Sequence, residues 1–134
     1  MNKRNFNLPY IPVAWGELFD KISILEIKKK NINEHDALKN ISKELDFLQD
    51  VAQSKIEMTH HLQKLLKDLK SINEALWEIE DKIRMKEHDQ NFDDAFIQLA
   101  RNVYITNDQR ALIKKEINNY LGSALVEEKS YKDY

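Results

Sequence analysis

Glycine and proline are almost absent from the chain, and this scarcity restricts the folds that it can adopt. Among 134 residues there are only two glycines and two prolines, and both prolines lie within the first twelve residues. Folds made of many short strands need such residues at their turns. Charged residues form 33% of the chain and hydrophobic residues 42%, with charges of both signs interleaved, which is typical of long amphipathic helices. We therefore expect an all-α protein with a single domain over residues 1–134.

Two long segments carry apolar residues at alternating steps of three and four residues. The first seam runs from Leu38 to Ala52 and the second from Met58 to Ile83. This heptad-like spacing predicts two long helices, joined by a chain reversal between Val51 and Glu57. Their simplest arrangement is a long antiparallel hairpin against which the other helices pack. The same seams can also pair between two copies of the chain, so a homodimer is an alternative to pairing within one chain.

The rest of the chain supplies two or three shorter helices, which gives four to five in all. In chain order we expect an extended arm over residues 1–11, a first helix from Pro12 to about Lys30, a short helix from Phe96 to about Ile105, a last helix from Thr106 or Asn107 to Leu121, and a tail over residues 123–134 that packs back on the bundle. Threonine and asparagine are favoured at helix starts, and Gly122 suits the position after a helix end.

Charge and hydropathy exclude several classes of protein. The net charge of −2 offers no overall basic field for nucleic acid. No apolar run approaches the roughly 20 residues that span a bilayer, and the N-terminal residues lack the apolar core of a secretion signal. The chain has no cysteine, which excludes disulfides and fits a reducing compartment. We therefore expect a cytoplasmic protein that neither binds nucleic acid nor inserts into a membrane.

Polar and aromatic residues gather between Asn73 and Arg110 in a way that the flanking segments do not match. One helical stripe, spaced i, i+4, i+7 and i+11, consists of Asn73, Trp77, Glu80 and Arg84. The neighbouring stripe carries Glu78 and Asp81. A solvated helix face rarely has a tryptophan at its centre, and a core face rarely has several carboxylates. This segment is therefore the candidate functional site.

The acidic residues suggest a divalent-metal site. Two i, i+3 pairs, one on the first helix and one on the long helix, consist of Glu17, Asp20, Glu78 and Asp81. Such oxygen ligands suit Mg²⁺ or Mn²⁺. The pairs resemble those of helical nucleoside-triphosphate pyrophosphatases, although a glutamate is expected where Asp20 stands. In this hypothesis Glu78 and Asp81 are also the catalytic acid and base. The alternative is that these acids are exposed and pair with lysines.

The aromatic and cationic residues suggest a cleft for a small anionic ligand, such as a sugar phosphate or a nucleotide sugar. Trp15 and Trp77 would stack on the ligand. Hydrogen bonds to it would come from Asn73, Arg84, Arg101, Tyr104, Asn107 and Arg110. The alternative is that Trp77 belongs to the core, and that the Glu80–Arg84 and Arg101–Asp108 pairs are structural.

Short sequence motifs occur in order along nearly the full chain. They are Pro12-Val13, Trp15-Gly16-Glu17-Leu18, Asp20-Lys21-Ile22, Asn73, Trp77, Glu80-Asp81, Arg84, Phe92-Asp93, Leu99-Ala100-Arg101, Val103-Tyr104, Asn107-Asp108, Arg110-Ala111, Gly122-Ser123 and Glu127-Glu128-Lys129-Ser130-Tyr131. Together they resemble an uncharacterised bacterial family, a helical domain of unknown function. The resemblance implies no established activity, but it associates the chain with surface-polysaccharide sugar transfer.

Two functions follow from these patterns. The first is the binding of a small anionic ligand in a polar and aromatic cleft, with metal-assisted turnover if the acids hold Mg²⁺ or Mn²⁺. The second is the binding of a partner protein, through the seams or through the tail, by an adaptor or dimerisation module that acts beside glycan-assembly enzymes.

Overall fold

The computed structural model describes residues 8–134, which contain four helices and no strand. The helices are α2 (Trp15–Asn31), α3 (His35–Lys55), α4 (His60–His88) and α5 (Asp94–Leu121). The prediction of an all-α fold is confirmed. Residues 1–7 of the predicted N-terminal arm lie outside the described part. None of these four helices combines the length and the apolar character that a membrane crossing requires.

Helix α5 is continuous, so the prediction of two helices that meet near Thr106 and Asn107 is wrong. Capping residue types interrupt a helix only where the chain also turns, and no glycine or proline stands near these positions. The Asn107 side chain instead accepts a hydrogen bond at 3.4 Å from Arg110, one turn further along the helix. The helix ends at Gly122, whose φ of 63° is left-handed, as predicted for the residue after a helix end.

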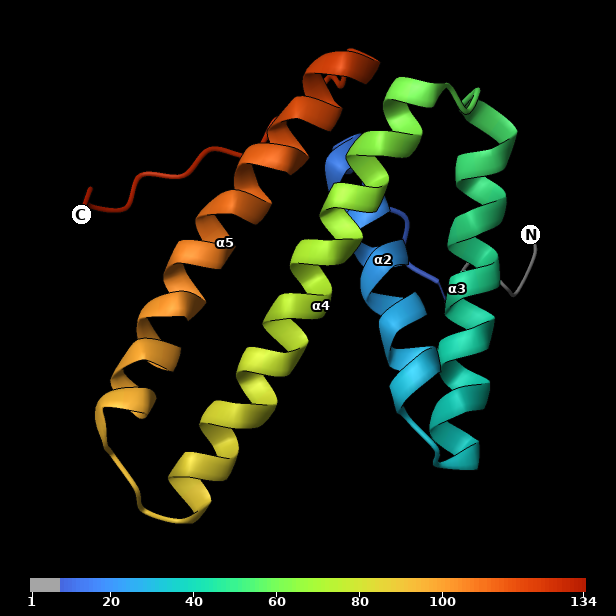
Figure 1. Cartoon of the computed structure of the whole chain (residues 1–134). Helices are drawn as coiled ribbons and strands as arrows, with labels where there is room; N and C mark the ends of the chain where they lie inside the picture. Colours follow the sequence, from blue (N-terminus) through green and yellow to red (C-terminus); the bar gives the residue numbers. More distant parts are fainter. Residues whose placement is uncertain (1–7) are drawn as a thin grey trace.

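Helix α2 lies at the centre of the bundle and packs against each of the other three helices. Successive helices run in opposite directions, and α2 lies between α3 and the α4–α5 pair (Figure 1). The chain reversal between α3 and α4 covers residues 56–59. The predicted hairpin of the two seams is not confirmed, because α2 separates the α3 and α4 backbones. The most extensive helix pairing joins α4 to α5.

The hydrophobic core lies where α2 meets its neighbours. Its fully buried apolar side chains are Leu62, Leu69 and Ile117. In α4 the last buried residue is Asn73, and in α5 the first is Ile117. The α4–α5 pair thus continues beyond the core as two helices without buried residues. We call this part, residues 74–109, the distal hairpin.

Gly16 sets the distance between α2 and α5. A Cβ at this position would lie 2.5 Å from the backbone oxygen of Lys114, so only glycine fits the present backbone approach. The start of α2 has no capping side chain of its own. Its backbone amides are bound by α5 and by the second residue after it: Gly16 donates to Asn118 Oδ1 at 2.6 Å, and Trp15 donates to Ser123 Oγ at 3.3 Å.

Candidate functional site

A buried carboxylate joins three helices. Asp20 of α2 is only 1% exposed. It accepts a hydrogen bond at 3.0 Å from Asn73 of α4 and one at 2.9 Å from Nε of Arg110 in α5. A second guanidinium nitrogen of Arg110 donates to its other oxygen, which makes the contact bidentate. Asn73 also donates to Ser23 at 3.2 Å. These residues form the Asp20 cluster.

Lys114, one turn beyond Arg110 on α5, extends the Asp20 cluster toward the tail. Its ammonium lies 2.7 Å from a carboxylate oxygen of Glu17, 3.1 Å from one of Glu127, and 3.8 Å from one of Asp20. One cation therefore faces acids from α2 and from the tail. This arrangement attaches both segments to the same turn of α5.

The two cations at the Asp20 cluster, Arg110 and Lys114, are stabilised in their ionised forms. The hydrogen bond to Asp20 raises the pKa of Arg110 and outweighs the opposing effect of burial. Burial lowers the pKa of Lys114, but hydrogen bonds to Glu17 and Glu127 and the charge of Asp20 outweigh it, so its pKa is raised overall. Both cations therefore stay charged throughout the physiological range.

The structure brings together five of the twelve residues predicted for the site. Asp20, Asn73, Asn107 and Arg110 belong to one hydrogen-bonded group, and Glu17 joins it through Lys114. All of them bind protein groups. Among the described residues, every buried side-chain nitrogen or oxygen has a hydrogen-bond partner. The arrangement is that of a satisfied polar network inside a helix junction.

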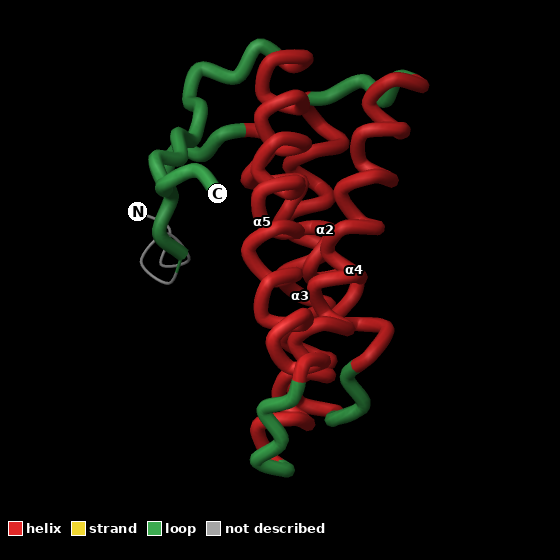
Figure 2. The backbone as a smooth tube through the Cα atoms, turned by 60° about the vertical axis from the view of Figure 1, so that its left-hand side comes forward, coloured by secondary structure: helices red, strands yellow, loops and turns green. Residues whose placement is uncertain are grey.

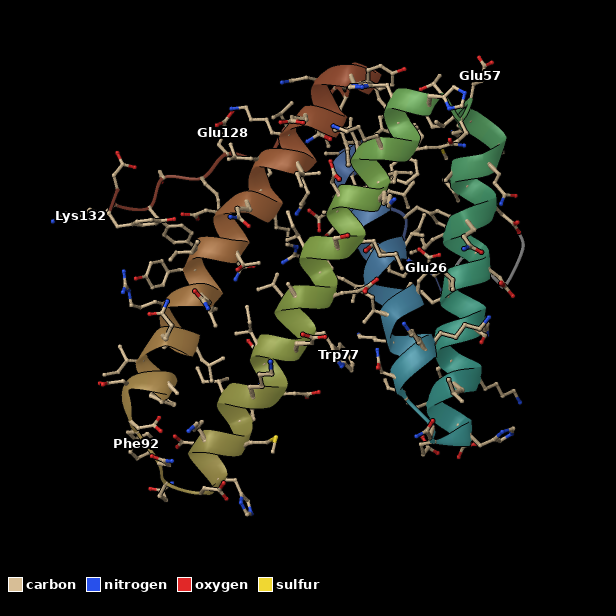
Figure 3. The ribbon with its side chains drawn as sticks, viewed as in Figure 1. Glu26, Glu57, Trp77, Phe92, Glu128 and Lys132 are labelled. Atoms are coloured by element: carbon tan, nitrogen blue, oxygen red, sulfur yellow. The ribbon has the colours of Figure 1, made fainter. Side chains whose placement is uncertain are left out.

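The two tryptophans lie at different places. Trp15 packs at the edge of the core, with its ring centroid 6.4 Å from that of Phe19. Trp77 is half-buried and projects from α4 toward the side on which α2 lies (Figure 3). Tyr104 contacts neither of them; its ring packs edge-on against Tyr134 of the tail, 5.2 Å between centroids. The structure does not stack the predicted aromatic residues around one ligand position.

The remaining predicted residues lie on the exposed surface of the distal hairpin. Glu78, Asp81 and Arg101 are exposed, and Arg84 pairs with Glu80 at 3.3 Å on the same surface. Asp108 pairs with Lys129 at 3.3 Å, in place of the predicted pairing with Arg101. Within residues 8–134, no group of three or more acids or histidines gathers closely enough to hold a metal ion.

Two hollows are lined by residues that the sequence did not predict for the site. The first, of about 550 Å³, lies between α5 and the tail, and Figure 2 shows the tail leaving the end of α5 and running outside the bundle. The second, of about 470 Å³, lies in the distal hairpin between α4 and α5. Its lining consists of Lys82, Met85, Lys86, Ala95, Gln98, Leu99 and Asn102. Lys114 of the Asp20 cluster was also missed, although it continues the stripe of Arg110 at i+4.

The comparisons with known proteins give a family and no activity. The chain belongs to a family of unknown function, DUF6165, whose model matches residues 10–134. A search of curated proteins and a search of solved structures each found no match to the chain.

Proposed function

We propose that this member of a family of unknown function is a helical interaction module, which binds a partner protein through the distal hairpin. The observation that carries the proposal is the 470 Å³ hollow between α4 and α5, lined by these two helices alone. Met85 in its wall is 65% exposed, and Phe92 and Ile97 on the same hairpin are 51% and 54% exposed. An exposed apolar side chain beside a hollow suits a protein-binding site, and methionine adapts well to a partner.

The Asp20 cluster supports this choice by its own completeness. Its two cations already face three carboxylates, so an anionic ligand would first have to displace them. Removing Arg110 from the buried Asp20 would leave that carboxylate with Lys114, 3.8 Å away, as its nearest cation, which is unfavourable. We therefore assign the Asp20 cluster to the stability of the helix junction, and binding to the distal hairpin.

The chemistry of the hollow defines the partner. Its lining includes the apolar side chains Met85, Ala95 and Leu99, and two lysines of α4, Lys82 and Lys86. Lys86 is already paired with Asp93 at 2.8 Å, which leaves Lys82 as the second cation of the lining. A complementary partner is an amphipathic helix that inserts one apolar side chain between acidic neighbours. Cytoplasmic glycan-assembly enzymes, implied by the family resemblance, are the first natural partners to test.

The proposal is tested with defined peptides. An amphipathic helical peptide with a single leucine between glutamates is titrated into the isotope-labelled full chain, and amide shifts are followed by NMR. We expect shifts around Met85 and Leu99, and a loss of affinity of about tenfold or more in Met85→Glu, because an apolar contact is replaced by like charges. The peptide with alanine for leucine should bind more weakly, and the peptide with lysines for glutamates should not bind.

Met58→Glu is the matched control variant. Met58 is an exposed methionine in the α3–α4 turn, at 47% exposure, and no residue of the turn lines the hollow. The control should bind the peptide like the unchanged protein. Equal losses in both variants, or peptide shifts outside the distal hairpin, would contradict the proposal.

A small anionic ligand is the second candidate function, and the hollow between α5 and the tail favours it. Its lining includes four lysines, Lys114, Lys115, Lys129 and Lys132, together with Tyr131 and Tyr134. The first three lysines pair with Glu127, Glu128 and Asp108 of the same lining, so an anionic ligand must displace these acids. Lysines and tyrosines are suited to bind the oxygens of a phosphate and the ring of a sugar or base. The predicted metal-assisted turnover is a separate hypothesis, because Glu78 and Asp81, which would hold Mg²⁺ or Mn²⁺, do not line this hollow.

A thermal-shift panel of inorganic phosphate, sugar phosphates and nucleotide sugars, each with and without Mg²⁺ or Mn²⁺, tests this candidate. Binding of the ligand to the folded state raises the melting temperature. A stabilisation that requires metal and disappears in Glu78→Gln with Asp81→Asn supports turnover. A panel without any stabilisation rejects the candidate and leaves the interaction module.

A further inference from the structure

The C-terminal tail returns along α5 in the direction opposite to the helix. After Gly122, Glu127 lies at Lys114, and Lys129 lies at Asp108, with 3.1 Å and 3.3 Å between the charged atoms. The last residue, Tyr134, packs its ring on Tyr104. Contacts therefore progress toward the start of α5 as the tail progresses toward its end.

Charge holds the tail in place, and apolar burial contributes little. A further ion pair joins Glu128 to Lys115 at 3.9 Å, on the same side of α5. The apolar side chains of the tail, Leu125, Val126 and Tyr131, remain exposed. Exposed ion pairs each contribute little to stability, and the hollow of about 550 Å³ separates much of the tail from the helix. Such a segment can leave the helix without disturbing the core.

The helix surface under the tail has a regular pattern of groups. We define the outer face of α5 as Tyr104, Asp108, Ala111, Leu112, Lys114 and Lys115. It presents an aromatic ring, an acid, two small or apolar side chains and a pair of adjacent lysines. Leu112 remains 63% exposed even with the tail in place. The face is therefore only partly covered.

We propose that the outer face of α5 is a binding surface for extended acidic segments, and that the tail occupies it within the same chain. The tail itself shows the chemistry that the surface recognises. Two adjacent carboxylates, Glu127 and Glu128, meet the lysine pair, and an aromatic residue further on meets Tyr104. A partner segment with the same order of groups competes for the same positions.

Covalent attachment gives the tail an advantage over any free segment. A linked segment acts at an effective concentration in the millimolar range. A free segment of equal intrinsic affinity binds poorly while the tail is in place, and binds well once the tail is detached. This inference concerns a surface that shares no residue with the 470 Å³ hollow of the distal hairpin, so it stands or fails independently of the proposed function.

The test uses a synthetic peptide of residues 123–134 and the isotope-labelled full chain. The variant Glu127→Lys with Glu128→Lys detaches the chain's own tail, while Lys114 keeps Glu17 and Asp20 as partners. We expect this variant to bind the peptide at least about tenfold more tightly than the unchanged chain. Amide shifts should concentrate between Tyr104 and Lys115. A peptide with lysines at positions 127 and 128 should not bind.

The outcomes are distinguished as follows. Equal binding of both peptides by the variant, or no binding of either one, would overturn the proposal. Persistence of the Tyr104–Tyr134 ring contact in the variant would also overturn it, because the tail would then be held by other groups. Tyr134→Ala provides a second route to a loosened tail and should increase peptide binding in the same direction. Far-ultraviolet circular dichroism confirms that each variant keeps its helices.

Discussion

The two halves of the α4–α5 pair contain the same kinds of residue and use them in opposite ways. Near the core, Asn73 and Arg110 are bound to the buried Asp20 and join three helices. In the distal hairpin, Glu80 and Arg84 continue the Asn73 stripe, yet they pair only with each other on an exposed surface. The difference lies in the neighbour: α2 covers the first half and leaves the second uncovered. A polar residue on a helix stripe is structural or available according to what packs on it.

Removal of the Asp20 carboxylate, which binds the core half of the α4–α5 pair, should cause the largest loss of unfolding free energy. Asp20→Ala leaves Arg110 and Lys114 without their shared acid inside the helix junction. Loss of one partner of a buried ion pair costs about 3 kcal/mol of unfolding free energy or more. We expect a loss at the lower end of this range, about 3 kcal/mol, since the Arg110 side chain is 27% exposed and water can reach it. Urea unfolding followed by circular dichroism measures the change.

The distal half offers the matched control for that experiment. Asp81→Ala removes an exposed carboxylate from α4 in the distal hairpin, and surface substitutions of this kind stay within about 0.5 kcal/mol. If both variants lose similar stability, the contrast between the two halves is wrong.

The substitution Gly16→Ala should produce an intermediate effect by pushing α2 away from α5. Alanine is the better helix former by about 1 kcal/mol. Against this gain, its Cβ would lie 2.5 Å from a backbone oxygen of Lys114, which cannot turn aside as a side chain can. Overpacking of this kind costs about 1–3 kcal/mol, so we expect a net loss of about 1 kcal/mol in unfolding free energy.

Hydrogen exchange at the Gly16 amide, which donates to Asn118, reports whether the loss arises at this contact. Exchange should accelerate there in Gly16→Ala. Lys29→Ala, at an exposed position of the same helix, should change neither exchange nor stability; an equal change in it would show that the effect is not specific to the close approach.

A substitution in the distal hairpin should weaken peptide binding strongly and should change the unfolding free energy little. Met85→Glu replaces a side chain that is 65% exposed, so its unfolding free energy should stay within about 0.5 kcal/mol of the unchanged protein. Peptide binding, in contrast, should fall strongly. Parallel urea unfolding and peptide titration on one sample separate the two quantities. A large loss of unfolding free energy would show that Met85 has a structural role, which would contradict the contrast between the two halves.

The sequence predicts the helices because each carries its own apolar period, and it predicts the polar stripe for the same reason. The spacing of Asn73, Trp77, Glu80 and Arg84 shows that they share a helix face. It does not show that α2 covers Asn73 and leaves Arg84 exposed, because that depends on the crossing of another helix. The continuity of α5 was missed at Asn107, where a capping residue type lies on an unbroken helix.

The smallest effect concerns pH and the end of the tail. The hydrogen bond from Tyr134, together with Lys129, lowers the pKa of Asp108, and the same hydrogen bond to Asp108 raises the pKa of Tyr134. Because the pKa of Asp108 is lowered in the attached state, Asp108 stabilises that state at pH values above its ordinary pKa. This stabilisation is lost as the pH falls through the lowered pKa. Because the pKa of Tyr134 is raised in the attached state, Tyr134 stabilises that state at pH values below its ordinary pKa. This stabilisation is lost as the pH rises through the raised pKa.

The attached tail should therefore be favoured between these two limits and should loosen at both extremes, while the helices persist. NMR signals of Tyr134 and of the tail amides, followed across an acid and an alkaline titration, measure this behaviour. The variant Asp108→Asn should reduce the loosening at acid pH, because an amide does not titrate, and should leave the alkaline loosening that follows phenol ionisation. Loosening at acid pH that is unchanged in Asp108→Asn would contradict this prediction, because Asp108 would then not help to attach the end of the tail.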